Sequence, residues 1–362
     1  MAQQHLDPTD PAADVATGES LAAYLRAQAT EFLRALRLHR ETGGNHQANG
    51  AEEPVDAARL LRRSARRISG NLHTFRPLLD PDWSEEMRPE LAWLSGTLGL
   101  EHAYEARLER LLLALHRLSG ATVLPAQAVD AALAAAPLPR GGAAGGAGTT
   151  ATQERGNLTV GAAKAGALLE RQLTLARTRA HSTALQALGS SRFHAVADKV
   201  AVLASEVPLT LTAPTTDLRP PAAAAEERLT AAIGALPLVT AGHPYNAEAL
   251  VHGLSPDPSP HPQDGPWHQV RLLLRLHRYA QEVLHGGDLP VDLRLLSAGQ
   301  ALNRHRDASE AAAAAAQAAR TPRIAPATAY ALGVLHADQR HEVEAARFAF
   351  QQAWQKQTVS AP

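Results

Sequence analysis

Residues 57–75 are AARLLRRSARRISGNLHTF, and residues 267–283 are WHQVRLLLRLHRYAQEV. Both segments carry three cationic side chains at the same spacing of three and then four residues, which places them on one face of an α-helix. We call Arg59, Arg62 and Arg66 the first ladder, and His268, Arg271 and Arg275 the second ladder.

An apolar stripe runs beside each ladder at helical spacing. The stripes are Leu61, Ala65, Ile68, Leu72 and Phe75 in the first segment, and Leu272, Leu276, Tyr279 and Val283 in the second. Each segment is therefore predicted to be a bundle helix that buries its stripe and carries its cations at the edge of the core. Two such helices indicate a duplicated unit whose halves bring their ladders together around one anionic ligand.

Acidic residues are absent from Ala57 to Phe75 and from Trp267 to Gln281. Neighbouring arginines repel each other on a helix, so the pattern favours an anion from outside the chain. The alternative is a solvated helix face, which is the usual reason for a charged stripe.

The composition predicts an all-α fold. The chain has 362 residues, 45% of them hydrophobic, which is enough for one large or two medium domains. There are only 5 Phe, 5 Tyr and 4 Trp, and alternating runs of Val, Ile and Thr are missing. The absence of cysteine excludes disulfides and thiolate metal sites, and it fits a reducing compartment.

Charge and hydropathy favour a cytoplasmic protein with no membrane partner, because the sequence has neither a signal peptide nor an apolar run of about 18 residues. The net charge of -1 argues against a globally basic nucleic-acid coat protein. Only Lys164, Lys199 and Lys356 are lysines; the other basic residues are arginines, whose forked donors suit oxyanions. A GC-rich genome would explain the same excess of arginine over lysine, because it favours arginine codons.

The chain is expected to fold as two helical halves. Residues 1–17 are predicted to be a disordered lead, 18–136 a first half, 137–157 a flexible linker and 158–357 a second half. Besides the two ladder helices, the first opened by Pro54 and ended by Pro77, helices are expected over about 19–38, 83–94, 98–118, 159–188, 193–203, 229–236, 293–302 and 326–356. Loops are expected over 41–53 and 255–266.

No catalytic or metal-binding constellation is found. The 17 histidines are scattered without an H-E-x-x-H spacing. The glycine-rich run Gly141–Gly148 lacks the lysine of a phosphate loop, and no nucleophile elbow or carboxylate pair occurs. The sequence therefore predicts a protein that is not an enzyme and that uses no metal or cofactor.

With the ladders placed, the sequence from about Gly18 to Gln357 resembles the CHAD family, the conserved histidine α-helical domain. Ala57–Ser69 is similar to the family's A-V-H-x-M-R-V-x-x-R-R-L-R, and Trp267–Glu282 is similar to its L-H-x-L-R-K-x-x-K-R-x-R-Y-x-x-E. Further similar stretches are Trp93–Gly99 with W-L-x-x-x-L-G, Arg179–Phe193 with R-A-H-x-x-L-x-x-L-x-S-x-R-Y/F, and Leu302–Ala308 with L-G-x-x-x-D-A.

The first signature departs from the family pattern at two positions. Arg59 replaces the histidine, which keeps a cation, and Ser69 replaces the final arginine, which removes a donor. The usual R-D-x-D of the first half is also replaced, by His102-Ala103-Tyr104-Glu105. Because the second ladder is nearly intact, it is expected to dominate binding.

The resemblance implies two four-helix bundles related by a pseudo-twofold axis (the CHAD fold), with a basic cavity between them that binds inorganic polyphosphate. It also implies an association with polyphosphate granules and their proteins. The implied polyphosphate ligands are Arg59, Arg62, Arg63, Arg66, Arg67, Arg179, His268, Arg271, Arg275, Arg278 and Tyr279.

Three other functions remain open. A nucleic-acid binder is disfavoured by the scarcity of aromatic residues near the ladders, because base stacking needs them. A metal-dependent phosphohydrolase lacks carboxylate clusters for a divalent cation. A helical scaffold with a degenerate cavity is the third alternative, because Arg59, Ser69 and Ala103 depart from the family pattern.

Overall fold

The computed structural model describes residues 16–44, 52–120, 148–243, 261–286 and 292–355. Over these residues every regular secondary-structure element is a helix. The only β-structure in them is two isolated bridges, Thr17 with Asp217 and Leu79 with Leu209. The predicted all-α fold is therefore confirmed. None of the described helices is both long and apolar enough to cross a membrane.

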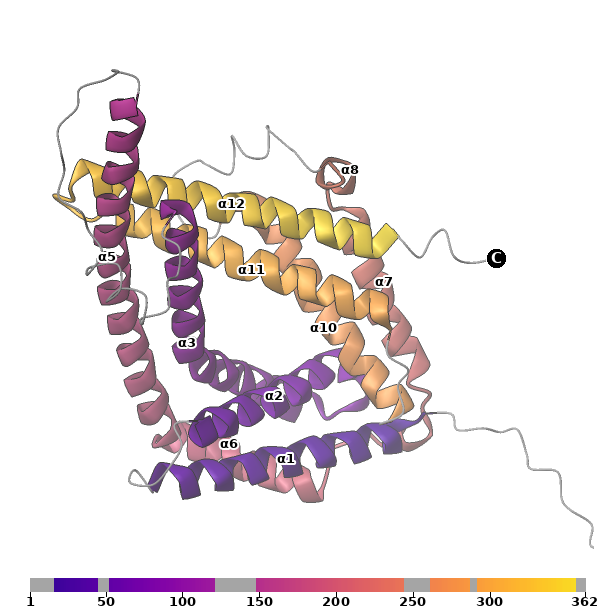
Figure 1. Ribbon diagram of the computed structural model, residues 1–362. Coiled ribbons are helices and arrows are strands. Elements are labelled where there is room, and N and C mark those ends of the chain that lie inside the picture. The colour runs from indigo at the N-terminus through magenta and orange to yellow at the C-terminus, as the bar shows by residue number, and fades with distance from the viewer. Residues whose placement is uncertain (1–15, 45–51, 121–147, 244–260, 287–291, 356–362) are drawn as a thin grey trace, which may run out of the picture. The chain divides into compact units, whose positions relative to one another are not determined.

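The described helices follow the order shown in Figure 1. They are α1 (Gly18–Gly44), α2 (Glu52–Thr74), η1 (Arg76–Leu78), α3 (Pro81–Ser119), α5 (Gly148–Leu188), α6 (Ser191–Ser205), η2 (Ala213–Thr215), α7 (Arg219–Gly234), α8 (Leu238–Ala241), η3 (Pro262–Asp264), α10 (Gly265–His285), α11 (Leu293–Ala319) and α12 (Pro326–Gln355).

Several boundaries differ from the sequence-based expectation. α3 is one helix rather than two, because the glycines near its middle do not interrupt it. α5 begins at Gly148, inside the predicted linker, and α7 begins ten residues before Leu229. α7 starts early because Asp217 Oδ1 accepts a hydrogen bond from the Arg219 backbone N–H at 2.9 Å, and prolines are tolerated in a first turn.

The expected loops are also shorter than predicted. α1 continues to Gly44 and α2 begins at Glu52, so part of the 41–53 loop is helical. The end of the 255–266 loop forms η3 and the start of α10. Residues 45–51 and 255–260 of these segments, and residues 1–15 of the predicted lead, lie outside the described residues.

The chain divides into two compact units. Unit 1 comprises Met1–Gly99, Ser182–Gly234 and Leu272–Asp292, and unit 2 comprises Leu100–His181, Ala235–Arg271 and Leu293–Pro362. Each unit thus draws on both sides of residues 137–157. The expected division of the sequence into two halves stays a prediction, as does the pseudo-twofold axis.

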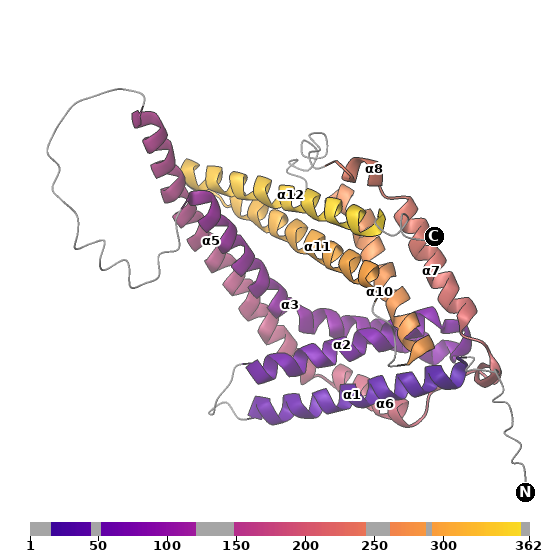
Figure 2. The same ribbon diagram turned by 45° about the vertical axis from the view of Figure 1, so that its right-hand side comes forward.

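Unit 1 is organised around α1, which packs against both α2 and α6 (Figure 2). Its core contains the first stripe together with residues from α1, α3, α6, α7 and the second half of α10. All five residues of the first stripe are fully buried: Leu61, Ala65, Ile68, Leu72 and Phe75. The prediction of an amphipathic helix at this position is confirmed.

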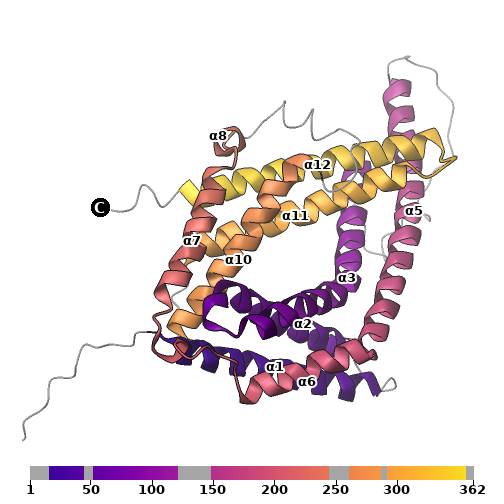
Figure 3. The ribbon, with the colours of Figure 1, turned by 180° about the vertical axis from the view of Figure 1, so that it is seen from behind.

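Unit 2 is organised around α11 and α12, which run antiparallel along each other (Figure 3). Most of the buried residues of α11 are alanines, among them Ala308, Ala311, Ala312, Ala315 and Ala318. Small side chains let two helix backbones approach closely, so the alanine-rich sequence becomes a packing surface.

Candidate anion-binding site

The first ladder lies along α2, beside the buried stripe. Arg59 is exposed, whereas Arg62 and Arg66 are half-buried at the edge of the core. Long cationic side chains commonly lay their methylene stems along apolar surface and keep their charged ends near water. The ladder therefore has the position that its spacing predicts.

Arg62 is held against α3. Its Nε donates a hydrogen bond to the Ser95 carbonyl oxygen at 3.1 Å. Its guanidinium occupies the space that a Cβ at residue 99 would need, so Gly99 makes room for it. The family-like stretch Trp93–Gly99 thus positions a ladder arginine.

Arg67, next to the ladder, is an internal ion-pair partner. Its Nε and Nη2 donate to the two carboxylate oxygens of Glu282, at 2.7 and 3.1 Å. The Tyr24 hydroxyl donates to the same carboxylate at 2.7 Å, and Arg278 Nε lies 3.6 Å from it. The guanidiniums of Arg67 and Arg278 lie 5.6 and 5.4 Å from the centre of the Tyr279 ring.

Glu282 provides an internal partner for arginines that the sequence alone suggested were unpaired. The acid-free stretch of the second segment ends at Gln281, and the next residue supplies a carboxylate to arginines of both segments. The interpretation that both segments depend on an outside anion is therefore wrong for Arg67 and Arg278. Burial raises the pKa of Glu282, but its hydrogen bonds from Arg67 and Tyr24 outweigh this and hold it below the ordinary value.

Tyr279 is a core residue. It is 4% exposed, and its Cδ2 lies so close to α2 that a Cβ at Gly70 would be 2.7 Å away. Leu276 and Val283 of the predicted second stripe are also buried, but Leu272 is 45% exposed, so the stripe was wrong at that position. The next two residues, Leu273 and Leu274, are buried instead.

The N-terminal part of the second ladder lies in unit 2. The His268 ring meets the His305 ring edge-on, with centroids 5.5 Å apart. Arg271 Nε donates to Asn303 Oδ1 at 2.8 Å. Burial lowers the pKa of His268, and the neighbouring Arg271 charge lowers it further, so at neutral pH the imidazole acts as an uncharged group.

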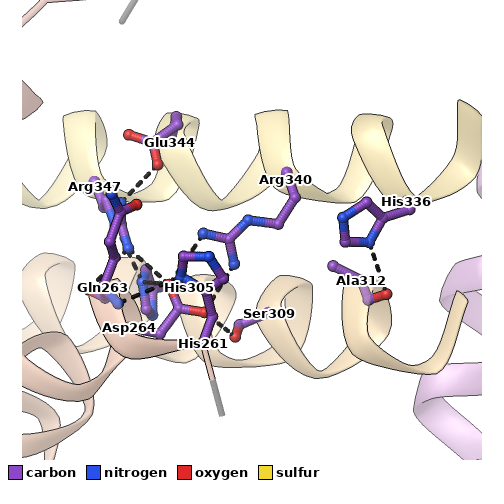
Figure 4. A network of polar contacts seen from close by, with 10 residues as sticks. All are labelled: His261, Gln263, Asp264, His305, Ser309, Ala312, His336, Arg340, Glu344 and Arg347. Carbon is purple, nitrogen blue, oxygen red and sulfur yellow. Dashed lines mark hydrogen bonds and ion pairs between the residues drawn. The ribbon is translucent and has the colours of Figure 1, made fainter. Parts of the chain in front are cut away.

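A buried polar network holds the start of α10 (Figure 4). Asp264, fully buried in η3, accepts hydrogen bonds from Arg340 Nη1 at 2.8 Å and Arg347 Nη2 at 2.7 Å, both from α12. It also accepts one from the Ser309 hydroxyl of α11. Burial alone raises the pKa of Asp264, but the neighbouring His305 ring, together with the hydrogen bonds and charge of Arg340, holds it well below its ordinary value.

His305 completes this network. Its Nε2 accepts from Arg347 Nε at 3.3 Å, and burial lowers its pKa to about 4, so the ring is neutral. Trp267 stacks on His305 and meets Phe350 edge-on, with ring centroids 5.6 Å apart in both pairs. Since Trp267 precedes His268, these contacts fix the first turn of the second ladder.

Asp264 was not identified from the sequence. It falls in the proline-rich stretch expected to be a surface loop, yet it is fully buried. The only available sign was an acid one helical turn before the second ladder.

A second cluster in unit 2 was also missed. Glu310 accepts hydrogen bonds from Arg107 of α3 at 2.5 Å and from Arg306 of α11 at 2.7 Å. The spacing of Arg306 and Glu310 predicts their pairing on one helix, but it cannot identify Arg107.

The structure divides the predicted ligands between the two units. Unit 1 contains Arg59, Arg62, Arg63, Arg66, Arg67, Arg275, Arg278 and Tyr279, and unit 2 contains Arg179, His268 and Arg271. Arg63 is exposed on α2 and Arg179 is exposed on α5. That all of them line one cavity stays a prediction. Among the described residues no group of three or more His, Cys, Asp or Glu side chains is placed to hold a metal ion.

Comparison with known proteins identifies the family. The CHAD domain model matches residues 27–292. PptA from Streptomyces chartreusis is 70% identical, with a TM-score of 0.74, over 94% of this chain and 99% of that chain. The CHAD domain from the plant Ricinus communis is 18% identical, with a TM-score of 0.49, over 97% of this chain and 94% of that chain. No curated protein matches. Because the family model covers well over half of its length, this chain belongs to the CHAD domain family.

Proposed function

We propose that this protein binds inorganic polyphosphate through its two ladders, without catalysing a reaction on it. The observation that carries the proposal is the first ladder on α2. Its three arginines lie beside a fully buried stripe, on a segment without any acid from Ala57 to Phe75. Membership of the CHAD family supports the same ligand, because the ladders coincide with the family's signatures.

The chemistry of the ladders suits a linear polyanion. Polyphosphate carries about one charge per phosphate, so it is best held by several forked donors in a row rather than by one deep pocket. Each charge-assisted hydrogen bond contributes about 1.5 to 3 kcal/mol before desolvation. Many such contacts give a binding strength that grows with chain length and falls with salt. We further propose a cytoplasmic location, on polyphosphate granules.

The test is a double charge reversal, Arg62→Glu with Arg271→Glu, one in each ladder. Calorimetric titration with polyphosphate of defined length should show binding weakened by at least about 100-fold, because two attractive contacts become repulsive. Helical content should stay unchanged by circular dichroism. Unchanged affinity would show that the ladders are not the polyphosphate-binding site.

The matched control reverses two arginines outside the ladders, Arg171→Glu on α5 and Arg228→Glu on α7, both exposed. It changes the net charge equally and should leave affinity within about threefold at moderate salt. Equal losses in both double variants would point to non-specific attraction. Easy displacement of polyphosphate by excess RNA would favour a nucleic-acid binder. If the wild-type protein bound no polyphosphate, the helical scaffold would be the remaining function.

A further inference from the structure

The Glu282 carboxylate collects side chains from three helices of unit 1. Tyr24 comes from α1, Arg67 from α2 and Arg278 from α10, the helix of Glu282 itself. Tyr279 lies beneath the two arginines. These five residues, which we call the Glu282 cluster, contain three of the predicted polyphosphate ligands.

Exposure separates the two arginines of the cluster. The Arg67 side chain is 12% exposed and the Glu282 side chain 18%, whereas the Arg278 side chain is 57% exposed. A polymer in solution can reach Arg278 but has little access to Arg67. Tyr279, in the core, has less access still.

The hydrogen bonds of Arg67 lead to the same division. Two of its donors are committed to Glu282 in a bidentate pair. A phosphate that captured them would strand a largely buried carboxylate, and removing one partner of a buried ion pair is strongly unfavourable. Arg67 is therefore better placed to hold α2 against α10 than to bind a ligand.

Arg278 gains orientation from the same cluster. Its Nε lies 3.6 Å from Glu282 and its guanidinium lies over the Tyr279 ring, so an exposed and flexible side chain is restricted before any ligand arrives. Restricting a side chain in its binding orientation reduces the entropy lost on association.

We propose that Glu282 is a positioning residue for polyphosphate binding: with Arg67 and Tyr279 it orients Arg278 toward the polymer, and Arg67 itself does not touch the phosphates. This inference rests on the proposed function. It follows that the ligand set expected from the sequence contains positioning residues as well as residues that contact phosphate.

The test replaces both members of the internal pair, Arg67→Gln with Glu282→Gln, which leaves the net charge unchanged. We expect polyphosphate affinity to fall about tenfold, because Arg278 loses its orientation. The slope of log K against log salt should stay the same, because no cation that contacts phosphate is removed. The single variant Arg278→Gln should lower the affinity and also reduce the slope, by about 0.7 as for a single-stranded polyanion.

The matched control is another bidentate pair of unit 1, Arg192 with Glu90, at 2.6 and 3.1 Å. Changing both to glutamine should alter neither affinity nor slope. Unchanged affinity in the Arg67→Gln, Glu282→Gln variant, with a lowered melting temperature alone, would reduce the pair to a structural role and overturn the proposal. A reduced slope in that variant would make Arg67 a ligand and overturn it too.

A second variant covers the case in which the pair cannot be removed without unfolding. Glu282→Asp keeps the charge but withdraws the carboxylate by one methylene, so it cannot hold Arg67 and Arg278 together. We expect about threefold weaker binding with an unchanged slope, and unaltered binding would contradict the proposal. Failure of wild type to bind would instead overturn the proposed function, so the two failures are distinguishable.

Discussion

Asp264 is a buried charge that is stabilised by several charged and hydrogen-bonding partners. A carboxylate without exposed surface is tolerated only when charged and hydrogen-bonding partners replace water. Arg340, Arg347 and Ser309 supply them, and Arg347 Nη1 also pairs with Glu344 at 2.6 Å. The two acids and two arginines balance in charge, so the network is neutral as a whole.

The first prediction at this scale is a large loss of stability in Asp264→Asn. Removing the charge leaves the buried Arg340 guanidinium without its carboxylate and leaves Arg347 with Glu344 alone, which should cost about 3 to 5 kcal/mol in the free energy of unfolding by urea. The control is Asp217→Asn, which removes the charge of a solvent-accessible pair with Arg219 and should cost much less stability. Similar losses in the two variants would contradict the assigned role of burial.

The second prediction concerns pH. His305 stays neutral in the folded state down to a pKa of about 4, whereas the unfolded chain takes up this proton near pH 6.5. Between these values the unfolded state binds more protons, so stability falls as the pH falls from about 6.5 to 4, by roughly 3 kcal/mol in all. The depressed pKa of Asp264 keeps its contribution in place above about pH 4.

Urea unfolding at pH 7, 6 and 5 measures how steeply the free energy of unfolding falls with pH. His305→Gln should be less stable at pH 7 but should lose less further stability on acidification, because the titrating group is gone. An equally steep slope in His305→Gln would assign the effect to other groups.

At the scale of elements, close helix approach depends on single glycines. In α5, a Cβ at Gly161 would overlap the Ala327 carbonyl in the first turn of α12, and this backbone atom cannot rotate away. In α12 itself, a Cβ at Gly333 would meet nothing within 4 Å. The same substitution should therefore have opposite effects at the two positions.

The third prediction follows from this contrast. Gly161→Ala should destabilise the protein by about 1 to 3 kcal/mol, because α5 must move away from α12. Gly333→Ala should stabilise it by about 0.4 to 1 kcal/mol, because alanine restricts the unfolded chain and fits the helix. Thermal unfolding of both variants checks the signs, and destabilisation by both would show that local crowding is not the cause.

The ladder helices were predictable at this scale because their information is local. Helical spacing places the first stripe on one face of α2, and all of it is buried. Element boundaries were less predictable. The glycines near the middle of α3 do not interrupt it, since residues on both sides, such as Leu94 and Leu111, are buried in the two cores.

At the scale of the whole molecule, the chain passes between its compact units several times. The core of unit 1 joins Leu61 from before residue 121 to Val200 from after residue 147. The core of unit 2 joins Leu111 to Leu335 across the same interval. A cut within residues 121–147 would therefore divide both cores between two fragments.

The fourth prediction is that such a cut leaves the fragments together. A protease site placed between residues 137 and 147 should give two fragments that co-elute in size-exclusion chromatography, because apolar area in both cores is buried between them. Denaturant should separate them. Spontaneous separation into two folded fragments would instead support independent halves of the sequence.

Local spacing and composition by themselves determined the all-α class, the amphipathic ladder helices and the family resemblance, since each depends on residues within a few turns of one another. The tertiary structure alone decided which charges are paired. Glu282 lies 215 residues from Arg67, and Asp264 lies 76 residues from Arg340. Helical periodicity states which face a side chain occupies, but whether that charge is solvated or buried against a distant partner depends on packing between helices.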